Sequence, residues 1–183
     1  MGSGTYRIFI DLSTFKICER SIIADFVVDH SVIEESLNFA DVQPWKLYID
    51  GSSHKNDTGV EILIISPENI PTKLKFRLDK LCSNNEAKYE ALIAGLEILL
   101  KLGAKDVENK GDSELVIKQL TKEYKCVKEN LIIYFATATA LLKCFNRANI
   151  QHVPRIENQE ANDLAQIASG YRITKIKLKS LSK

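Results

Sequence analysis

The alternation of apolar and polar residues predicts three strands in the middle of the chain. In "WKLYIDGSS" (45–53), Trp45, Leu47 and Ile49 would lie on one face of a strand and the intervening residues on the other. We expect that strand to end at Gly51 and the two serines after it. Two further strands are predicted between turn-forming residues, in "GVEILIISPEN" (59–69) and "TKLKFRLDKL" (72–81). Three short consecutive strands favour an antiparallel meander.

Helical spacing dominates the second half of the sequence. "SNNEAKYEALIAGLEIL" (83–99) predicts a helix with Ser83 or Asn84 as its N-cap, Glu86 in its first turn and Gly103 after its end. The elements predicted after it are a strand at 105–110, a helix from Asp112 or Ser113, a helix from about Glu129 to Phe145, a strand at 148–155, and a helix capped by Asn158 and stopped by Gly170. This order predicts an α/β fold: a five-stranded mixed sheet, with three antiparallel strands and then parallel ones, and helices on both faces.

The two ends of the chain have weaker patterns than its middle. "NFADVQP" (38–44) is a polar stretch that ends in a proline, which indicates a boundary. We therefore expect an N-terminal segment with a linker (1–43), one folded domain (44–171) and a loose basic tail (172–183).

Composition limits the classes of function. The chain has 183 residues, 45% of them apolar, and 25 basic against 24 acidic residues, so its net charge of +1 gives no overall case for a nucleic-acid partner. The most apolar run, "LIIYFATATALL" (131–142), is shorter than the about 20 residues that span a bilayer, and we expect no membrane partner. Four scattered cysteines without the spacing of a zinc site favour a reduced, intracellular compartment.

Three aspartates lie where a metal site could form. Asp50 is late in the first strand, Asp112 follows the fourth strand at a helix entrance, and Asp163 lies in the last predicted helix. Carboxylates from separate elements are typical of a Mg²⁺ site. Taken alone these positions indicate little, because an aspartate at a strand end or a helix N-cap is more often structural.

Four motifs that occur in one order are far more specific. They are "LYIDGSS", "SNNEAKYEALIAGLEIL", "GDSELVIKQL" and "HVPRIENQEANDLAQIAS". Together they resemble the type 1 ribonuclease H domain, in the form found in plant retrotransposon polyproteins of the gypsy type, over about residues 44–171. The earlier "RSIIADFVVDH" (20–30) resembles the segment that joins a reverse transcriptase to that domain. The resemblance implies a ribonuclease H-like fold, an RNA–DNA hybrid as ligand and a reverse transcriptase module as a further partner.

The resemblance also implies a set of site residues. Family members cut the RNA strand of an RNA–DNA hybrid with two Mg²⁺ ions, or Mn²⁺, held by an Asp, Glu, Asp and Asp set. Asp50 and Asp112 match the first and third of these positions. Asn84 and Asn85 match the pair that contacts the backbone of the hybrid, and His152 matches the mobile histidine before the final helix. Without the resemblance, His152 is more often a strand-end residue than a functional one.

Two of the four carboxylate positions are substituted in this chain. The family's Glu position is Lys88, and its last Asp position is Asn162, with Asp163 one residue further on. An amide oxygen can still coordinate Mg²⁺ without the charge, and Asp163 lies about 100° further around the helix, a poor substitute. Glu61 is a third departure, in a strand where relatives usually carry a small residue. We therefore expect weakened Mg²⁺ binding.

Lys88 decides how much of the family's chemistry remains. Glu86 and Glu90 lie two residues on either side of it, about 200° around the helix, and we place them on an outer, solvated face with Glu97. An ammonium group close to two Mg²⁺ ions would repel both. Lys88 then either neutralises the two aspartates as an internal substitute for the metal, or points out to solvent.

Three functions follow as alternatives from these observations. The first is hybrid cleavage, retained weakly at best. The second is a catalytically inactive hybrid-binding module or decayed retroelement copy. The third is a protein-interaction domain without a nucleic-acid role, against which Asn84 and Asn85 argue.

Overall fold

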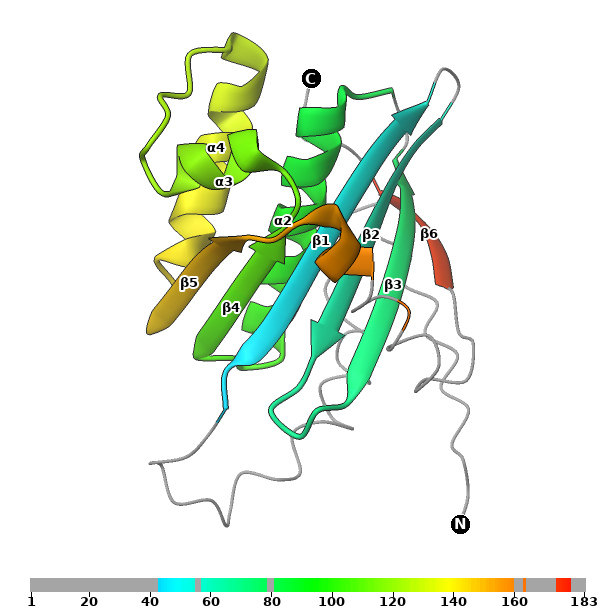
Figure 1. Ribbon diagram of the computed structural model, residues 1–183, viewed down its shortest axis with the longest axis vertical. Helices are drawn as coiled ribbons and strands as arrows, with labels where there is room; N and C mark the ends of the chain where they lie inside the picture. The colour runs from blue at the N-terminus through cyan, green and yellow to red at the C-terminus, as the bar shows by residue number, and fades with distance from the viewer. Residues whose placement is uncertain (1–42, 55–56, 79–80, 160–162, 164–173, 179–183) are drawn as a thin grey trace.

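A computed structural model describes residues 43–54, 57–78, 81–159, 163 and 174–178. Within these residues, six strands form one mixed sheet in the order β5-β4-β1-β2-β3-β6 (Figure 1). The strands are β1 (Trp45–His54), β2 (Asp57–Ile65), β3 (Pro71–Leu78), β4 (Asp106–Gly111), β5 (Arg147–His152) and β6 (Thr174–Leu178). The first three form the antiparallel meander, while β4 pairs with β1 and β5 with β4 in parallel. The predicted α/β class and its five strands are confirmed.

The sixth strand was not predicted. β6 pairs with β3 in parallel, so the expectation of a loose tail is wrong for Thr174–Leu178. In this segment lysine alternates with threonine, isoleucine and leucine, which is a pattern typical of an edge strand. Five residues within a basic stretch are too few for that period to stand out. The boundaries proposed at residues 43 and 171 stay predictions, because 1–42 and 164–173 lie outside the described residues.

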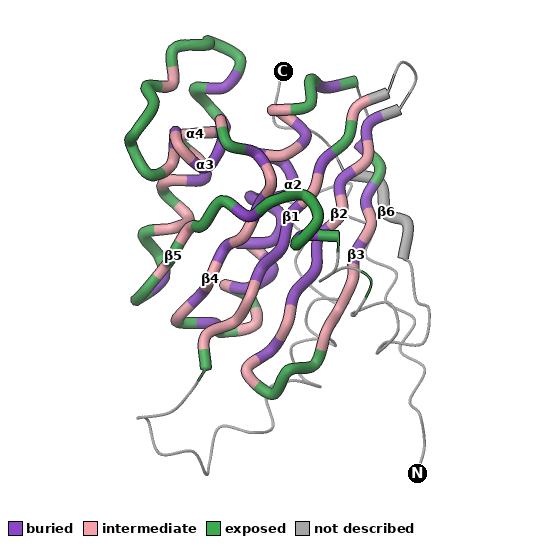
Figure 2. Tube along the Cα trace, in the orientation of Figure 1, coloured by how far each residue is buried: buried purple, intermediate pink, exposed green. Residues whose placement is uncertain are grey.

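Helices lie on both faces of the sheet, as expected. The helices are α2 (Asn84–Lys101), α3 (Glu114–Leu120) and α4 (Glu129–Leu142), and residues 155–159 are also helical. In Figure 1, α2 lies behind the strands and residues 155–159 cross in front of them. Figure 2 shows buried segments along the central strands and α2, whereas the loop between α3 and α4 is exposed.

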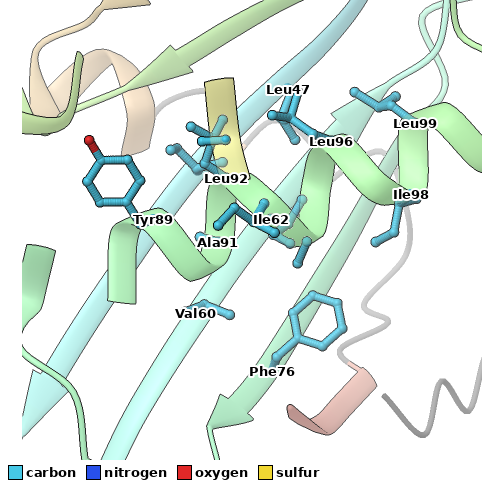
Figure 3. Packing of buried hydrophobic residues seen from close by; sticks show 14 of the residues in the cluster. Leu47, Val60, Ile62, Phe76, Tyr89, Ala91, Leu92, Leu96, Ile98 and Leu99 are labelled. Carbon is cyan, nitrogen blue, oxygen red and sulfur yellow. The ribbon is translucent and has the colours of Figure 1, made fainter. Parts of the chain in front are cut away.

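The main core lies between α2 and one face of the sheet. Leu47 of β1, Ile62 of β2 and Phe76 of β3 pack in one cluster with Leu92 and Leu96 of α2 (Figure 3). These side chains are at most 3% exposed. Alternate residues of the strands and one face of α2 therefore pack together in one apolar layer. The opposite face of the sheet has a smaller cluster around Tyr48 and Leu63.

The helix caps resolve two alternatives left open by the sequence. Ser83, not Asn84, caps α2: its hydroxyl accepts a hydrogen bond from the Glu86 N–H at 3.3 Å, and the Glu86 carboxylate accepts one from the Ser83 N–H at 2.8 Å. Ser113, not Asp112, caps α3. The side chains of Asn84 and Asp112 are therefore available for other contacts.

We expected the first strand to end at Gly51 and the two serines after it, but the strand continues to His54. The residues from Gly51 to His54 continue the antiparallel pairing with β2, and Gly51 itself lies close to α2. A Cβ atom at Gly51 would lie 2.6 Å from the carbonyl carbon of Ala87 and 2.7 Å from the backbone nitrogen of Lys88. Glycine is thus required here because helix backbone and strand backbone touch, and not because the chain turns.

This contact gives a testable prediction. Gly51→Ala should destabilise the domain by about 1–3 kcal/mol, since the new methyl group meets backbone atoms that cannot move aside cheaply. Gly59→Ala is the matched control on the adjacent strand, where the nearest atom to an added Cβ is 3.7 Å away. Urea unfolding of both variants measures the difference. Equal stability of the two would contradict the close approach of α2 to β1.

The prediction that Glu86, Glu90 and Glu97 lie on a solvated outer face of α2 is partly wrong. Glu90 is only 3% exposed, and its carboxylate accepts a hydrogen bond of 2.9 Å from the Tyr134 hydroxyl of α4. Burial raises the pKa of Glu97, which is half-buried, to about 7, and the nearby charge of Glu90 acts in the same direction. The helix α4 packs on this side of α2, so a face that looks polar in the sequence lies largely inside the protein.

Candidate nucleic-acid interface and acidic edge

The parallel strands bring the predicted aspartates to one edge of the sheet. In the strand register, Ile49 of β1 lies beside Gly111 of β4, and Gly111 lies beside His152 of β5. Asp50 directly follows Ile49 in the chain, and Asp112 directly follows Gly111. Because parallel strands end at the same edge, the two carboxylates come from neighbouring positions.

Lys88 turns toward this edge and not toward solvent. Its ammonium nitrogen lies 2.9 Å from Oδ1 of Asp112, and it donates a hydrogen bond to that oxygen. The Lys88 side chain is 19% exposed and the Asp112 side chain 9% exposed, so water screens this ion pair only partly. The close contact of Gly51 with the backbone of Lys88 fixes where this side chain starts.

Asp50 lies in the same electrostatic environment. Burial raises the pKa of its carboxyl group above the usual range, and the negative charge of Asp112 raises it further. Lys88, a hydrogen bond from the Gly51 N–H and Arg155 act in the opposite direction. Two carboxylates and two cations therefore meet at this edge.

Arg155 is a residue that the sequence analysis missed. It is exposed, it is the first residue of the helical stretch 155–159, and its charge acts on Asp50. The sequence contained a signal for this helix start, because Arg155 directly follows Pro154 and proline is favoured at the start of a helix.

The expectation that Asn158 caps the last helix is wrong. Asn158 lies inside the helical stretch that begins at Arg155, and it is 2% exposed. Its side-chain amide donates a hydrogen bond of 3.2 Å to the carbonyl oxygen of Ile49, the residue before Asp50. Pro154 starts the helix earlier than the asparagine pattern suggested, and Asn158 instead ties that helix to β1.

The two asparagines predicted to contact a hybrid lie at the start of α2. Asn84 is exposed, and its side-chain oxygen accepts a hydrogen bond of 2.9 Å from the Ser53 N–H. This bond uses the oxygen and not the amide N–H₂ group, which is a donor suited to phosphate oxygens. Asn85 is half-buried. The end of β1 and the start of α2 are thus joined beside the acidic edge.

Two of the remaining predicted residues are exposed, and one lies outside the described residues. His152 is exposed at the end of β5. Asp163 is exposed, and its carboxylate accepts a hydrogen bond of 2.8 Å from the Gln159 amide. Asn162 lies outside the described residues, so its predicted part in the site stays a prediction.

Glu61 adds a carboxylate next to the site, but it is held by other partners. It is the cross-strand neighbour of Asp50, and its two oxygens form ion pairs with Lys73 and Lys75 of β3. Both oxygens of the carboxylate are thus engaged by lysines of β3. Glu61 therefore does not replace the missing family glutamate.

The residues at this edge fit a pair of divalent cations poorly. Mg²⁺ is bound by oxygen ligands, and Asp50 and Asp112 supply carboxylates, but an ammonium group already occupies one oxygen of Asp112. Among the described residues, no group of three or more metal-binding side chains of the His, Cys, Asp and Glu types comes together. The arrangement instead resembles a carboxylate pair with a built-in counter-ion.

An antiparallel meander followed by parallel strands, a long helix against the first strand and aspartates at their shared edge define a ribonuclease H-like domain. The chain belongs to the family described as "Reverse transcriptase-like", whose sequence profile matches residues 49–168. A crystal structure of RNase H1 from Halobacterium salinarum has a TM-score of 0.61 and 34% identity, over 69% of this chain and 97% of that one.

Further comparisons agree with this assignment. The ribonuclease HI sequence of Halobacterium salinarum is 43% identical over 86 residues, which are 47% of this chain and 43% of that protein. This chain thus spans less than half the length of that relative. The RNase H1 named LC11, solved in complex with an RNA/DNA hybrid, has a TM-score of 0.58 and 27% identity, over 69% of this chain and 96% of that one. Within the described ranges, no helix has the length and apolar character needed to cross a membrane.

Proposed function

We propose that this chain is a hybrid-binding ribonuclease H-type domain in which strand cleavage is impaired. The observation that carries the proposal is the 2.9 Å ion pair between Lys88 and Asp112 at the acidic edge. A cation that belongs to the protein stabilises this edge where the family would use Mg²⁺.

The impairment follows from the charge of Lys88. At about 4 Å and an effective dielectric constant of about 20, two unit charges interact by about 4 kcal/mol. Asp50 and Asp112 would be the ligands of a bound Mg²⁺, and Lys88 would compete for Asp112 and repel the ion. When bound, Mg²⁺ supplies activation of the attacking water and stabilisation of the leaving oxygen. We propose that both Mg²⁺ and Mn²⁺ bind weakly to this chain.

Hybrid binding rests on parts of the surface that this substitution leaves intact. Asn84 is exposed beside the acidic edge, and Arg155 places a positive charge at the same edge. Amide N–H groups and arginine side chains are common contacts of phosphate backbones. The LC11 relative, solved with an RNA/DNA hybrid, supports the same ligand for this fold.

A binding titration and a cleavage assay together test the proposal. We expect a labelled RNA–DNA hybrid to be retained in filter binding with and without Mg²⁺, while a gel shows little or no cut RNA in Mg²⁺ or Mn²⁺. Affinity should fall with salt along a shallow slope, because few phosphates are contacted by cations. Equal affinity for an unrelated acidic polymer at every salt concentration would favour a protein-interaction domain. Efficient cleavage by the parent chain would contradict the impairment.

A conservative substitution of Asn84 separates binding from folding. Asn84→Asp keeps an oxygen acceptor for the Ser53 N–H but replaces the amide donor by a negative charge that faces phosphate. We expect hybrid affinity to fall about tenfold while the melting temperature stays near that of the parent. Asn84→Ala is the comparison, because it also removes the bond to Ser53. Unchanged hybrid affinity in Asn84→Asp would place the nucleic-acid surface elsewhere.

We also propose that the chain acts beside a reverse transcriptase module, as part of a retrotransposon polyprotein. The segment "RSIIADFVVDH" (20–30) supports this, and it lies outside the described residues. Co-purification of this chain with a separately expressed reverse transcriptase module tests the proposal. A deletion of residues 1–43 that binds the module as well as the full chain does would contradict the part assigned to that segment.

A further inference from the structure

The outer face of α4 is apolar and exposed, which is unusual for a helix at the surface. The buried face of α4 is formed by Leu131, Tyr134 and Ala138. On the opposite side, Ile132 is 46% exposed and Ile133 is 49% exposed. From Asn130 to Leu142 the sequence contains no charged residue. A surface helix that only covers the core would have polar residues on its solvent-exposed face.

Helical geometry collects six exposed residues into one stripe. At about 100° per residue, all six lie within about 50° of the direction opposite to the buried face. We call this set the α4 stripe, and its members are Glu129, Ile132, Ile133, Ala136, Ala140 and Lys143. The stripe has an acidic residue at its start, a basic residue at its end and small or branched apolar residues between them.

We propose that the α4 stripe is a homodimer interface, in which a second copy of this chain packs its own α4 antiparallel to the first. The residues are complementary about a twofold axis at Ala136. Glu129 and Lys143 are equally distant from Ala136 along the helix. Glu129 of one copy would therefore face Lys143 of the second copy, and Lys143 would face Glu129. The charge at each end is thereby neutralised.

The same axis also matches the sizes of the side chains. Ile132 and Ala140 are equally distant from Ala136, so a branched side chain of one copy lies against a small one of the other. Ala136 meets its own copy at the axis, where its methyl group lets the two backbones approach closely. A crossing angle of about 20°, at which ridges of residues spaced by three on one helix pack into the grooves between residues spaced by four on the other, keeps contact along both helices.

The small area of the stripe argues for a weak dimer. The helix has 14 residues and is about 21 Å long, so one pair of helices buries less than the about 1,200 Å² of a standard stable interface. We therefore expect a reversible dimer with a dissociation constant of about 10–100 µM. The interface uses a face of α4 that is not packed on α2, so the proposal does not depend on the proposed hybrid binding.

Sedimentation equilibrium of the full chain over concentrations on both sides of this range tests the proposal. We expect the parent to dimerise and Ala136→Glu to weaken the dimer at least tenfold, because two like charges would meet at the axis. Asn130→Glu is the matched control, since it adds the same charge to the same helix at an exposed position outside the stripe. It should dimerise as the parent does.

Charge reversal and cross-linking make the test specific for the antiparallel geometry. Glu129→Lys should weaken the dimer, and the double variant Glu129→Lys/Lys143→Glu should restore it. Ala136→Cys should form a disulfide-linked dimer on mild oxidation, at a rate well above that of the parent chain, which has its own exposed Cys144, and of Asn130→Cys. A parent that remains monomeric throughout, or an Ala136→Glu variant that dimerises as the parent does, overturns the proposal.

Discussion

Replacing Lys88 by glutamate is expected to produce Mg²⁺-dependent cleavage of RNA–DNA hybrids well above that of the parent chain. The substitution removes the ammonium group that lies 2.9 Å from Asp112 and supplies the carboxylate that the family has at this position. We expect at least a tenfold gain in rate, equivalent to about 1.4 kcal/mol, which is a fraction of the about 4 kcal/mol of one such repulsion. Asn162→Asp added to Lys88→Glu should increase the rate further.

The same substitution should change how stability depends on Mg²⁺. Without metal, Lys88→Glu brings three carboxylates together and should lower the melting temperature. Added Mg²⁺ should recover it, since the ion would bind the folded state alone. Lys88→Gln is the control that removes the cation without adding a ligand. If Mg²⁺ raises the melting temperature of the parent as much as that of Lys88→Glu, then Lys88 does not exclude the metal.

The second large effect is expected from Glu97, at a distance from the proposed site along α2. Burial raises the pKa of its carboxyl group to about 7, Glu90 adds to this, and Lys101 partly opposes it. In the unfolded chain the group titrates near its ordinary value of 4.5. Between these two values the folded state holds a proton that the unfolded state has lost. The free energy of unfolding therefore falls as the pH rises through this window, and the loss is complete above it.

Glu97→Gln should remove this dependence. At pH 8 we expect the variant to be more stable than the parent by about 2 kcal/mol, and at pH 4 the two should be nearly equal. Urea unfolding across this pH range measures the difference. Glu157→Gln, at an exposed position, is the control for loss of one negative charge in general. A gain from Glu97→Gln that is the same at both pH values would show that burial of the charge is not its cause.

The features that the sequence predicted well depend on local order along the chain. The alternation around Leu47 and Ile49 predicted the core face of β1, and both side chains are at most 3% exposed. The orientation of Lys88 also follows from position, because it lies on the face of α2 that carries Leu92 and Leu96. A helical period determines which residues share a face, and this was sufficient to bring the lysine to the aspartates.

The features that the sequence analysis missed depend on contacts between distant elements. Glu90 looks solvated until α4 covers it and Tyr134 supplies a hydrogen-bond donor. Asn158 has the features of a helix cap, yet it binds the carbonyl oxygen of Ile49, which is 109 residues away in the chain. No window of neighbouring residues contains both partners of either pair. The positions of Asp50 and Asp112 at one edge follow from the strand order, whereas the partners of the buried polar groups were not predictable.

The position of β6 has a consequence for how the sheet is completed and protected. Its parallel pairing joins Leu74 to Thr174, residues that are 100 positions apart (174 − 74), so the contact closes a very long loop and should form late in folding. Until then the outer edge of β3 has unpaired backbone N–H and C=O groups, which can recruit a strand from another chain. A form of the chain that ends before Thr174 would keep this edge open in its folded state. Such a form should aggregate during refolding more readily than the full chain.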